Sequence, residues 1–232
     1  MQQEAAEQQF QNNSDWWKCS WIMPEIFGQL PGNADQLDEM LESSAQLYKH
    51  DRTTTVAVVN VGGQDFVLKR YNARNHWHII KRAFRRTRAR RCWQMSSAFT
   101  CAGLNVADPA LMFEKRFGPV RQNAYFMNRK LAGEELLDLL PEMPRATQEK
   151  VALEIKQIFA KMRRHKISHG DMKASNLIWQ DGRLFFIDLD AAQKHITAIG
   201  WLAAHRKDKK RFLKNWRTQA PIMNLFKNLM DW

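Results

Sequence analysis

The 232-residue sequence predicts an α+β fold with two lobes, a small antiparallel-sheet lobe followed by a mainly helical lobe. Two observations favour this class. β-branched and apolar runs surround a Gly-Gly pair between residues 53 and 71, and apolar positions recur at helical spacing after residue 147. A chain of this length can bury one sizeable core or a two-lobed unit. We therefore place an N-terminal extension over residues 1–50, the first lobe over 51–127 and the second over 128–232.

The N-terminal extension contains three different segments. Residues 1–14 are rich in Gln, Asn and Glu, a composition typical of disorder. Residues 16–23 form a Trp-rich cluster, which either packs on the first lobe or anchors the chain at a boundary between lipid headgroups and water. We favour packing, because the cluster is too short to show an amphipathic period. Residues 35–48 predict a short helix.

The first lobe opens with a predicted β-hairpin. Residues 53–61 and 64–71 form its strands, and Gly62-Gly63 is the turn signal. A second antiparallel pair is predicted over residues 111–116 and 122–127, around Gly118-Pro119.

The segment between these two pairs, residues 75–103, is helical in tendency and densely basic. Charges of one sign repel each other unless an anion binds, although a solvated helix face is the alternative. The formal net charge of +12 also favours an anionic partner. No nucleic-acid motif accompanies the charge, so we predict an anionic substrate or membrane surface and no nucleic acid. The basic residues are Lys81, Arg82, Arg85, Arg86, Arg88, Arg90 and Arg91.

The second lobe begins with a predicted short helix over residues 133–140. Thr147 is the predicted N-cap of a longer helix that ends near His165. That helix has a buried apolar stripe, to which we assign no chemistry. It leads the chain directly into a polar loop. The stripe consists of Val151, Ile155, Ile158 and Met162.

This loop, residues 169–176 with the sequence HGDMKASN, carries the residue types that phosphoryl transfer from ATP requires. Asp171 is the candidate base for the attacking hydroxyl, and Lys173 the cation that steadies the transferred phosphoryl group. Asn176 and Asp188, the latter delivered by an apolar strand, offer hard oxygen atoms for Mg²⁺. An isolated Asp after Gly is otherwise a turn residue. His169 is expected to organise the loop by hydrogen bonding.

Residues of the first lobe complete the predicted nucleotide site. Lys69 lies near the end of the hairpin, where its point charge suits a phosphate of ATP, although a lone strand lysine is usually an exposed edge charge. Backbone groups near Met127 and Asn128 could hold adenine, although a core strand would show the same apolar pattern.

The loop resembles the catalytic loop of protein-kinase-like enzymes, whose pattern H-x-D-x-x-x-x-N it matches. Residues 66–78, 82–93 and 102–109 are in addition similar to the lipopolysaccharide core kinases, the WaaP-like family. The similarity spans residues 53–212. The resemblance implies a protein-kinase-like fold and Mg-ATP-dependent phosphorylation of a sugar hydroxyl, expected to be heptose, of the lipopolysaccharide inner core.

Three alternative functions are compatible with these residues. Small-molecule phosphotransferases of the aminoglycoside or choline kinase type use a similar loop but usually need an acidic pocket for a cationic acceptor. A protein kinase would carry a fuller segment after Asp190. A non-catalytic scaffold is favoured by the lack of any Glu between Lys69 and Glu114, where kinases place the partner of the strand lysine. Gln94, Glu39 or Glu42 could substitute for that partner.

The tail and the overall composition bear on location. Residues 201–232 combine basic residues with apolar helical spacing, which suits either an amphipathic helix at an anionic membrane or the last helix of the second lobe. The sequence shows no transmembrane run or signal pattern, and its three cysteines lack metal-site spacing. We expect a cytoplasmic protein, peripheral on the inner membrane, whose acceptor is lipopolysaccharide core or another lipid-linked sugar.

Overall fold

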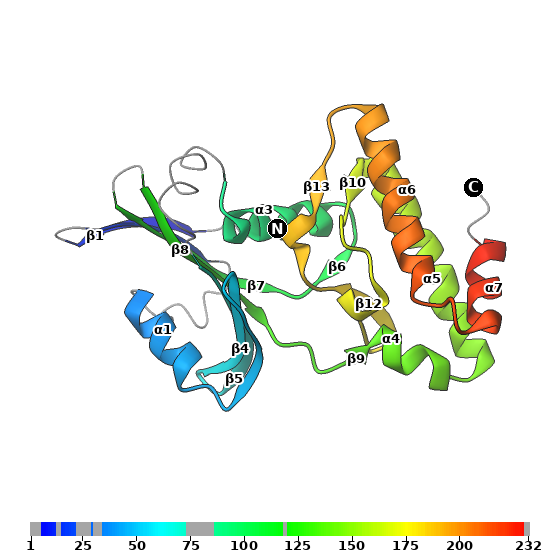
Figure 1. Cartoon of the computed structure of the whole chain (residues 1–232), viewed down its shortest axis with the longest axis horizontal. Helices are drawn as coiled ribbons and strands as arrows, with labels where there is room; N and C mark the ends of the chain where they lie inside the picture. Colours follow the sequence, from blue (N-terminus) through cyan, green and yellow to red (C-terminus); the bar gives the residue numbers. More distant parts are fainter. Residues whose placement is uncertain are drawn as a thin grey trace. The chain divides into compact units, whose positions relative to one another are not determined.

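The computed structural model describes residues 6–12, 15–21, 29, 34–72, 86–117 and 120–229. The chain divides into two compact units. Met1–Gln94 and Asp108–Lys130 form the sheet unit, whereas Met95–Ala107 and Leu131–Trp232 form the helical unit. An antiparallel sheet dominates the first and helices dominate the second (Figure 1), so the predicted α+β fold is confirmed.

The sheet unit contains a seven-stranded antiparallel sheet with the order β1-β2-β7-β8-β5-β4-β3. The predicted hairpin is confirmed, because β4 pairs with β5 from Thr54↔Tyr71 to Val61↔Gln64. Gly62 and Gly63 make the turn with φ of 58° and 79°, a conformation that glycine adopts without a steric penalty. The second predicted pair is confirmed as β7 and β8. The strands are β1 (Ala6–Asn12), β2 (Asp15–Trp21), β3 (Gln46–His50), β4 (Thr54–Val61), β5 (Gln64–Tyr71), β7 (Pro109–Phe117) and β8 (Val120–Arg129).

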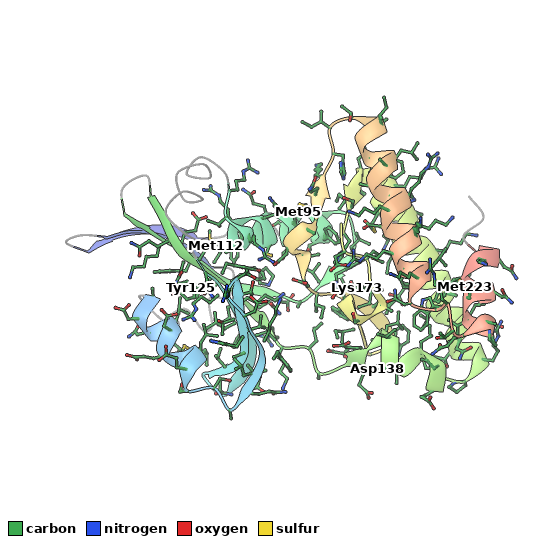
Figure 2. The ribbon with its side chains drawn as sticks, in the orientation of Figure 1. Met95, Met112, Tyr125, Asp138, Lys173 and Met223 are labelled. Carbon is green, nitrogen blue, oxygen red and sulfur yellow. The ribbon has the colours of Figure 1, made fainter. Side chains whose placement is uncertain are left out.

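Both faces of this sheet are covered. Side chains alternate along the strands, so Leu111 and Phe113 belong to one apolar cluster and Met112 to another. Helix α1 (Ala34–Glu42) packs against the first cluster, which includes Tyr125, and the start of α3 (Arg88–Cys101) packs against the second. Met112 and Tyr125 are labelled in Figure 2. The period-two alternation of the strand sequences therefore produces two separate cores in this unit.

Two predictions for the extension are corrected by the structure. Residues 6–12, predicted as disordered, form strand β1, whose backbone pairs with the Trp-rich β2 from Ala6↔Trp21 to Asn12↔Asp15. The predicted helix over 35–48 ends at Glu42, and Tyr48 lies in β3. Ser43 Oγ donates to the Glu39 carbonyl and Ser44 Oγ to the Val58 carbonyl. Such side-chain bonds to the backbone compete with helix continuation.

Parts of two other predicted segments lie outside the described residues. Of the Trp-rich cluster, residues 22 and 23 are not described, and the remainder forms the sheet strand β2. Of the basic segment over 75–103, residues 75–85 are not described, and these include Lys81, Arg82 and Arg85. The predicted helical tendency is seen from Arg88 onward, in α3.

The helical unit is built around α5 (Arg145–His165). The predicted stripe on this helix is buried and joins one large apolar cluster with Phe99, Phe186, Phe212 and Phe226. The other helices are α4 (Leu136–Leu139), η2 (Leu140–Glu142), η3 (Ala174–Asn176), η4 (Leu189–Ala191), α6 (Ala198–Lys214) and α7 (Ala220–Leu229). Short strands complete the unit: β6 (Asn105–Val106), β9 (Glu134–Glu135), β10 (Ile167–Ser168), β11 (Leu177–Gln180), β12 (Arg183–Phe186) and β13 (Gln193–Lys194).

The start of α5 differs from the prediction, and the packing of the C-terminal tail decides between the two roles considered for it. Thr147 is not the N-cap of α5, because the helix begins at Arg145 after Pro144, whose ψ of 146° is outside the helical region. In the tail, Phe212, Trp216 and Phe226 are fully buried in the apolar cluster. The tail therefore completes the core of the helical unit. Within the described residues, we find no helix of sufficient length and apolar character to cross a membrane.

Candidate active site

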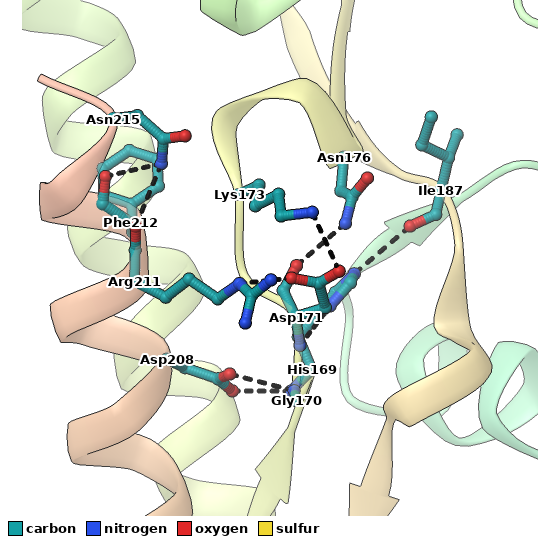
Figure 3. A network of polar contacts seen from close by, with 10 residues as sticks. All are labelled: His169, Gly170, Asp171, Lys173, Asn176, Ile187, Asp208, Arg211, Phe212 and Asn215. Atoms are coloured by element: carbon teal, nitrogen blue, oxygen red, sulfur yellow. Dashed lines mark hydrogen bonds and ion pairs between the residues drawn. The ribbon is translucent and has the colours of Figure 1, made fainter.

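The loop over residues 169–176 is anchored to α6 by one buried carboxylate. The backbone N–H groups of His169 and Gly170 donate to the two oxygens of Asp208, at 2.7 and 2.9 Å (Figure 3). Asp208 is completely buried, and burial raises its pKa to about 6, even though backbone hydrogen bonds favour its ionised form. Asp208, 39 positions after His169, therefore fixes the start of the loop relative to α6.

His169 is held so that it organises the loop. Its Nε2 lies 3.2 Å from the carbonyl oxygen of Ile187, and its Nδ1 lies 3.3 Å from the backbone nitrogen of Asp171. The two contacts together assign the proton to Nε2, because only an unprotonated Nδ1 can accept from Asp171. The ring is fully buried and stacks on Phe186 at 5.5 Å. One nitrogen is bound within the loop and the other to the strand end at Ile187, in agreement with the predicted organising role.

Gly170 has a backbone conformation and a location that exclude a side chain. Its φ is 78°, and a Cβ atom would lie 2.4 Å from the carbonyl oxygen of Ala191. We expect Gly170→Ala to lower the free energy of unfolding by about 2–4 kcal/mol, from backbone strain and from the clash. Chemical denaturation measures this loss.

Gly182→Ala is the matched control for that measurement. Gly182 has a similar φ of 74°, but nothing lies within 4 Å of the position its Cβ would take. Its substitution should cost only the backbone strain, about 1–2 kcal/mol. Equal losses for the two variants would show that the contact with Ala191 does not constrain the loop.

The carboxylate of Asp171 lies between two cations, as Figure 3 shows. Its Oδ2 is 3.3 Å from Lys173 Nζ, and its Oδ1 contacts Nε of Arg211 from α6. The Asp171 side chain is 25 % exposed, so the group is reachable from solvent on one side. Ion pairs this exposed contribute at most about 1 kcal/mol to stability. Their main effect is to fix the orientation of the carboxylate.

Asn176 and Asp188, the predicted metal ligands, lie at the same end of the β11–β12 hairpin. Leu177 pairs with Phe186, and the next bond outward runs from Ile187 N–H to the Asn176 carbonyl at 3.0 Å. Asn176 Nδ2 donates to the Asp171 carbonyl at 2.8 Å. The side-chain oxygen of Asn176 therefore points away from the Asp171 carbonyl. Asp188 adopts a left-handed conformation with φ of 59°, uncommon outside glycine.

This donor set fits Mg²⁺. An amide oxygen and a carboxylate are hard ligands, and Mg²⁺ usually takes only one or two from the protein and the rest from phosphates and water. Among the described residues, no group of three or more His, Cys, Asp or Glu side chains could hold a metal ion. A site made from Asn176 and Asp188 alone would therefore depend on the nucleotide for its remaining ligands.

The predicted nucleotide contacts Lys69, Met127 and Asn128 belong to the sheet unit. Lys69 is half-buried in β5, opposite Val56 of β4 and Phe126 of β8. Met127 is fully buried in the core, and Asn128 Nδ2 donates to the Arg129 carbonyl at 3.0 Å. The contacts of these three residues with ATP stay predictions.

The sheet unit also contains a buried acid on the same face as Lys69. Glu114 of β7 is 1 % exposed and lies opposite Ala124, two positions along β8 from the partner of Lys69. Its Oε1 accepts from the hydroxyl of Thr87. Of the substitutes considered from the sequence, Gln94 accepts from Arg86, and Glu39 and Glu42 are exposed on α1. Glu114 follows the expected helix in the sequence, so the kinase pattern does not point to it.

Sequence reasoning also missed Asp208 and Arg211. Residues 205–211 have the composition of a basic helix face, and Arg211 is one of its charges. One signal was available: Asp208 is the single acidic residue of α6, within an otherwise basic stretch. A lone acid in such a stretch is a candidate for a specific buried contact. No pattern near Arg211 in the sequence indicates its ion pair with Asp171.

The fold and this loop define a protein-kinase-like class of protein. The chain matches the Lipopolysaccharide kinase (Kdo/WaaP) family over residues 38–226 and belongs to that family. Its fold is similar to that of WaaP, solved in complex with acyl carrier protein, with a TM-score of 0.55 and 19 % identity, covering 87 % of this chain and 98 % of that one. The KEOPS complex subunit Bud32 of Pyrococcus abyssi (strain GE5 / Orsay) is 32 % identical over 72 residues, 31 % of this chain. The match spans 33 % of Bud32.

Proposed function

We propose that the chain is an ATP- and Mg²⁺-dependent kinase that phosphorylates a sugar hydroxyl, expected to be heptose, of the lipopolysaccharide inner core. The observation that carries the proposal is the arrangement around Asp171. This carboxylate is partly exposed, oriented by two cations, and placed on a loop that a buried Asp208 anchors. Family membership supports a lipopolysaccharide acceptor.

In this mechanism Asp171 accepts the proton of the attacking sugar hydroxyl. Lys173, whose Nζ lies 3.3 Å from that carboxylate, is near enough to neutralise charge on the transferred phosphoryl group. Asn176 and Asp188 would hold Mg²⁺, which neutralises charge on the triphosphate when bound. Lys69 would contact an ATP phosphate, and the backbone near Met127 and Asn128 would hold adenine.

We expect the protein to act on the cytoplasmic side of the inner membrane, where its acceptor is anchored by lipid. Ile196, which precedes α6, and Ile199, in the first turn of α6, are 95 % and 84 % exposed. Exposed apolar side chains beside a basic helix suit contact with an anionic lipid surface. We expect no nucleic-acid partner.

Two alternatives are less well supported. A small-molecule kinase with a cationic acceptor would need acids around Asp171, but Lys173 and Arg211 flank it. A non-catalytic scaffold would not need an oriented and partly exposed carboxylate at this position.

Mass spectrometry of the lipopolysaccharide core tests the proposal in the source bacterium. A strain that lacks the gene should lose one phosphate, and the wild-type gene should restore it. The same gene with Asp171→Asn should not. An unchanged core mass on deletion would exclude this acceptor, and fragmentation of the restored core distinguishes heptose from a neighbouring sugar.

A further inference from the structure

A strongly basic cavity of about 460 Å³ lies beside the candidate catalytic loop, within the helical unit. Six of its seven described lining residues are cationic, and none of the seven is acidic. Four of the cations come from α6 and are spaced i, i+3, i+4 and i+7, which places them on one side of the helix. The lining residues are Lys173, Lys207, Lys210, Arg211, Lys214, Asn215 and Arg217, and we call this site the α6 cation pocket.

The α6 cation pocket is continuous with the candidate base. Lys173 and Arg211 belong to its lining, and both contact the carboxylate of Asp171. Arg211 uses Nε for this contact, while its planar guanidinium carries further N–H donors that can bind a second oxyanion. A group held in the pocket by Arg211 would therefore lie close to the position where the acceptor hydroxyl must meet Asp171.

The charge of the pocket requires an explanation. Cations three and four positions apart on a helix repel each other, so the row from Lys207 to Lys214 is unfavourable for α6 itself. Lys207, Lys210 and Lys214 are exposed, so core packing does not explain them. A bound anion converts this repulsion into charge-assisted hydrogen bonds. A flat lipid surface meets convex side chains more readily than a concave pocket, which favours a discrete anionic group.

We propose that the α6 cation pocket binds an anionic group of the acceptor, a phosphate or a carboxylate close to the hydroxyl that is phosphorylated. The pocket thereby selects anionic acceptor sugars over neutral ones. This inference rests on the proposed function, because it assigns the substrate class of the same site. It adds a requirement that the catalytic residues alone do not impose.

Binding measured without ATP tests the proposal independently of catalysis. Isothermal titration would compare three forms of lipid-free core oligosaccharide with the full-length protein: intact, dephosphorylated with hydrofluoric acid, and carboxyl-reduced. We expect removal of the recognised anion to weaken binding about tenfold or more, the effect of losing one or two charge-assisted hydrogen bonds. The two treated forms tell whether phosphate or carboxylate is recognised.

Variants of exposed α6 residues locate the effect. Lys210→Ala combined with Lys214→Ala should weaken binding of the intact oligosaccharide about tenfold and remove most of the difference between intact and treated forms. Arg206→Ala is the matched control, because Arg206 is exposed on the same helix but does not line the pocket. Thermal unfolding verifies that all variants are folded.

Each outcome bears on one proposal only. Equal affinity for the three oligosaccharides, or equal weakening by Arg206→Ala, overturns the pocket. The double variant could also leave the affinity for the oligosaccharide unchanged and abolish binding to anionic phospholipid vesicles. That result overturns the pocket as well, because the α6 lysines would then bind the membrane. If the intact oligosaccharide binds as expected but receives no phosphate from ATP, the proposed function fails and the pocket stands. If all three forms are phosphorylated with equal kcat/KM, the pocket fails and the function stands.

Discussion

Asp171→Asn should lower kcat for phosphate transfer by about 10²–10⁴-fold, the usual contribution of a general base. The amide keeps the shape of the side chain but cannot take the proton of the attacking hydroxyl. Because the ion pairs with Lys173 and Arg211 are partly exposed, we expect the free energy of unfolding to fall by at most about 1 kcal/mol. Transfer of labelled phosphate from ATP to purified core oligosaccharide measures the rate.

Asp181→Asn is the control for this substitution. It makes the same chemical change in the same unit, at an exposed turn residue with φ of 50°, a conformation that Asn tolerates. Its rate should stay within about twofold of the wild type, since surface substitutions rarely matter. A rate for Asp171→Asn that is equally close to wild type would remove Asp171 from the mechanism.

The sequence predicts the local parts of this structure well. The hairpin around Gly62-Gly63 and the stripe of α5 follow from patterns within about 20 residues, because periodicity and turn residues act locally. Predicted boundaries fail where a few residues compete. Pro144 displaces Thr147 from the start of α5, and Ser43 and Ser44 end the helix that was expected to reach Tyr48.

In the candidate active site too, the local features are predicted and the contacts between distant segments are not. The roles predicted for Asp171, Lys173, Asn176 and Asp188 depend on a short motif, and the structure brings these residues together around one loop and one hairpin. The support of that loop comes from α6, through residues whose local sequence resembles a solvated basic face. Contacts between segments 39 positions apart arise from packing, which no single pattern in the sequence records.

Removal of the Asp208 carboxylate should therefore lower both the stability of the protein and the catalytic rate that depends on the loop. We expect Asp208→Ala to lower the free energy of unfolding by about 2–5 kcal/mol, because the N–H groups of His169 and Gly170 lose their buried acceptors. We also expect kcat to fall about 10–100-fold, since a small displacement of Asp171 is costly in a reaction that depends on positioning. The KM for ATP should change little. Denaturation and steady-state kinetics measure the two effects.

The pH dependence of stability distinguishes loss of the Asp208 carboxylate from general damage. Burial raises the pKa of Asp208 from 3.8 to about 6, so the folded protein binds a proton more tightly here than the unfolded chain does. The Asp208 contribution to the free energy of unfolding is therefore largest below about pH 4, decreases as the pH rises to about 6, and is constant above.

Comparison of the wild type with Asp208→Asn isolates this contribution. Asn keeps one acceptor for the loop but cannot titrate, so the stability difference between the two proteins should decline between pH 4 and 6 and then level off. The neighbouring His205, whose pKa burial lowers to about 4, has the opposite pH dependence, but both proteins contain it and its effect cancels. A difference that is independent of pH across this range would mean that Asp208 is ionised throughout. The loop would then be held by a carboxylate that gains more from its N–H donors than it loses by burial.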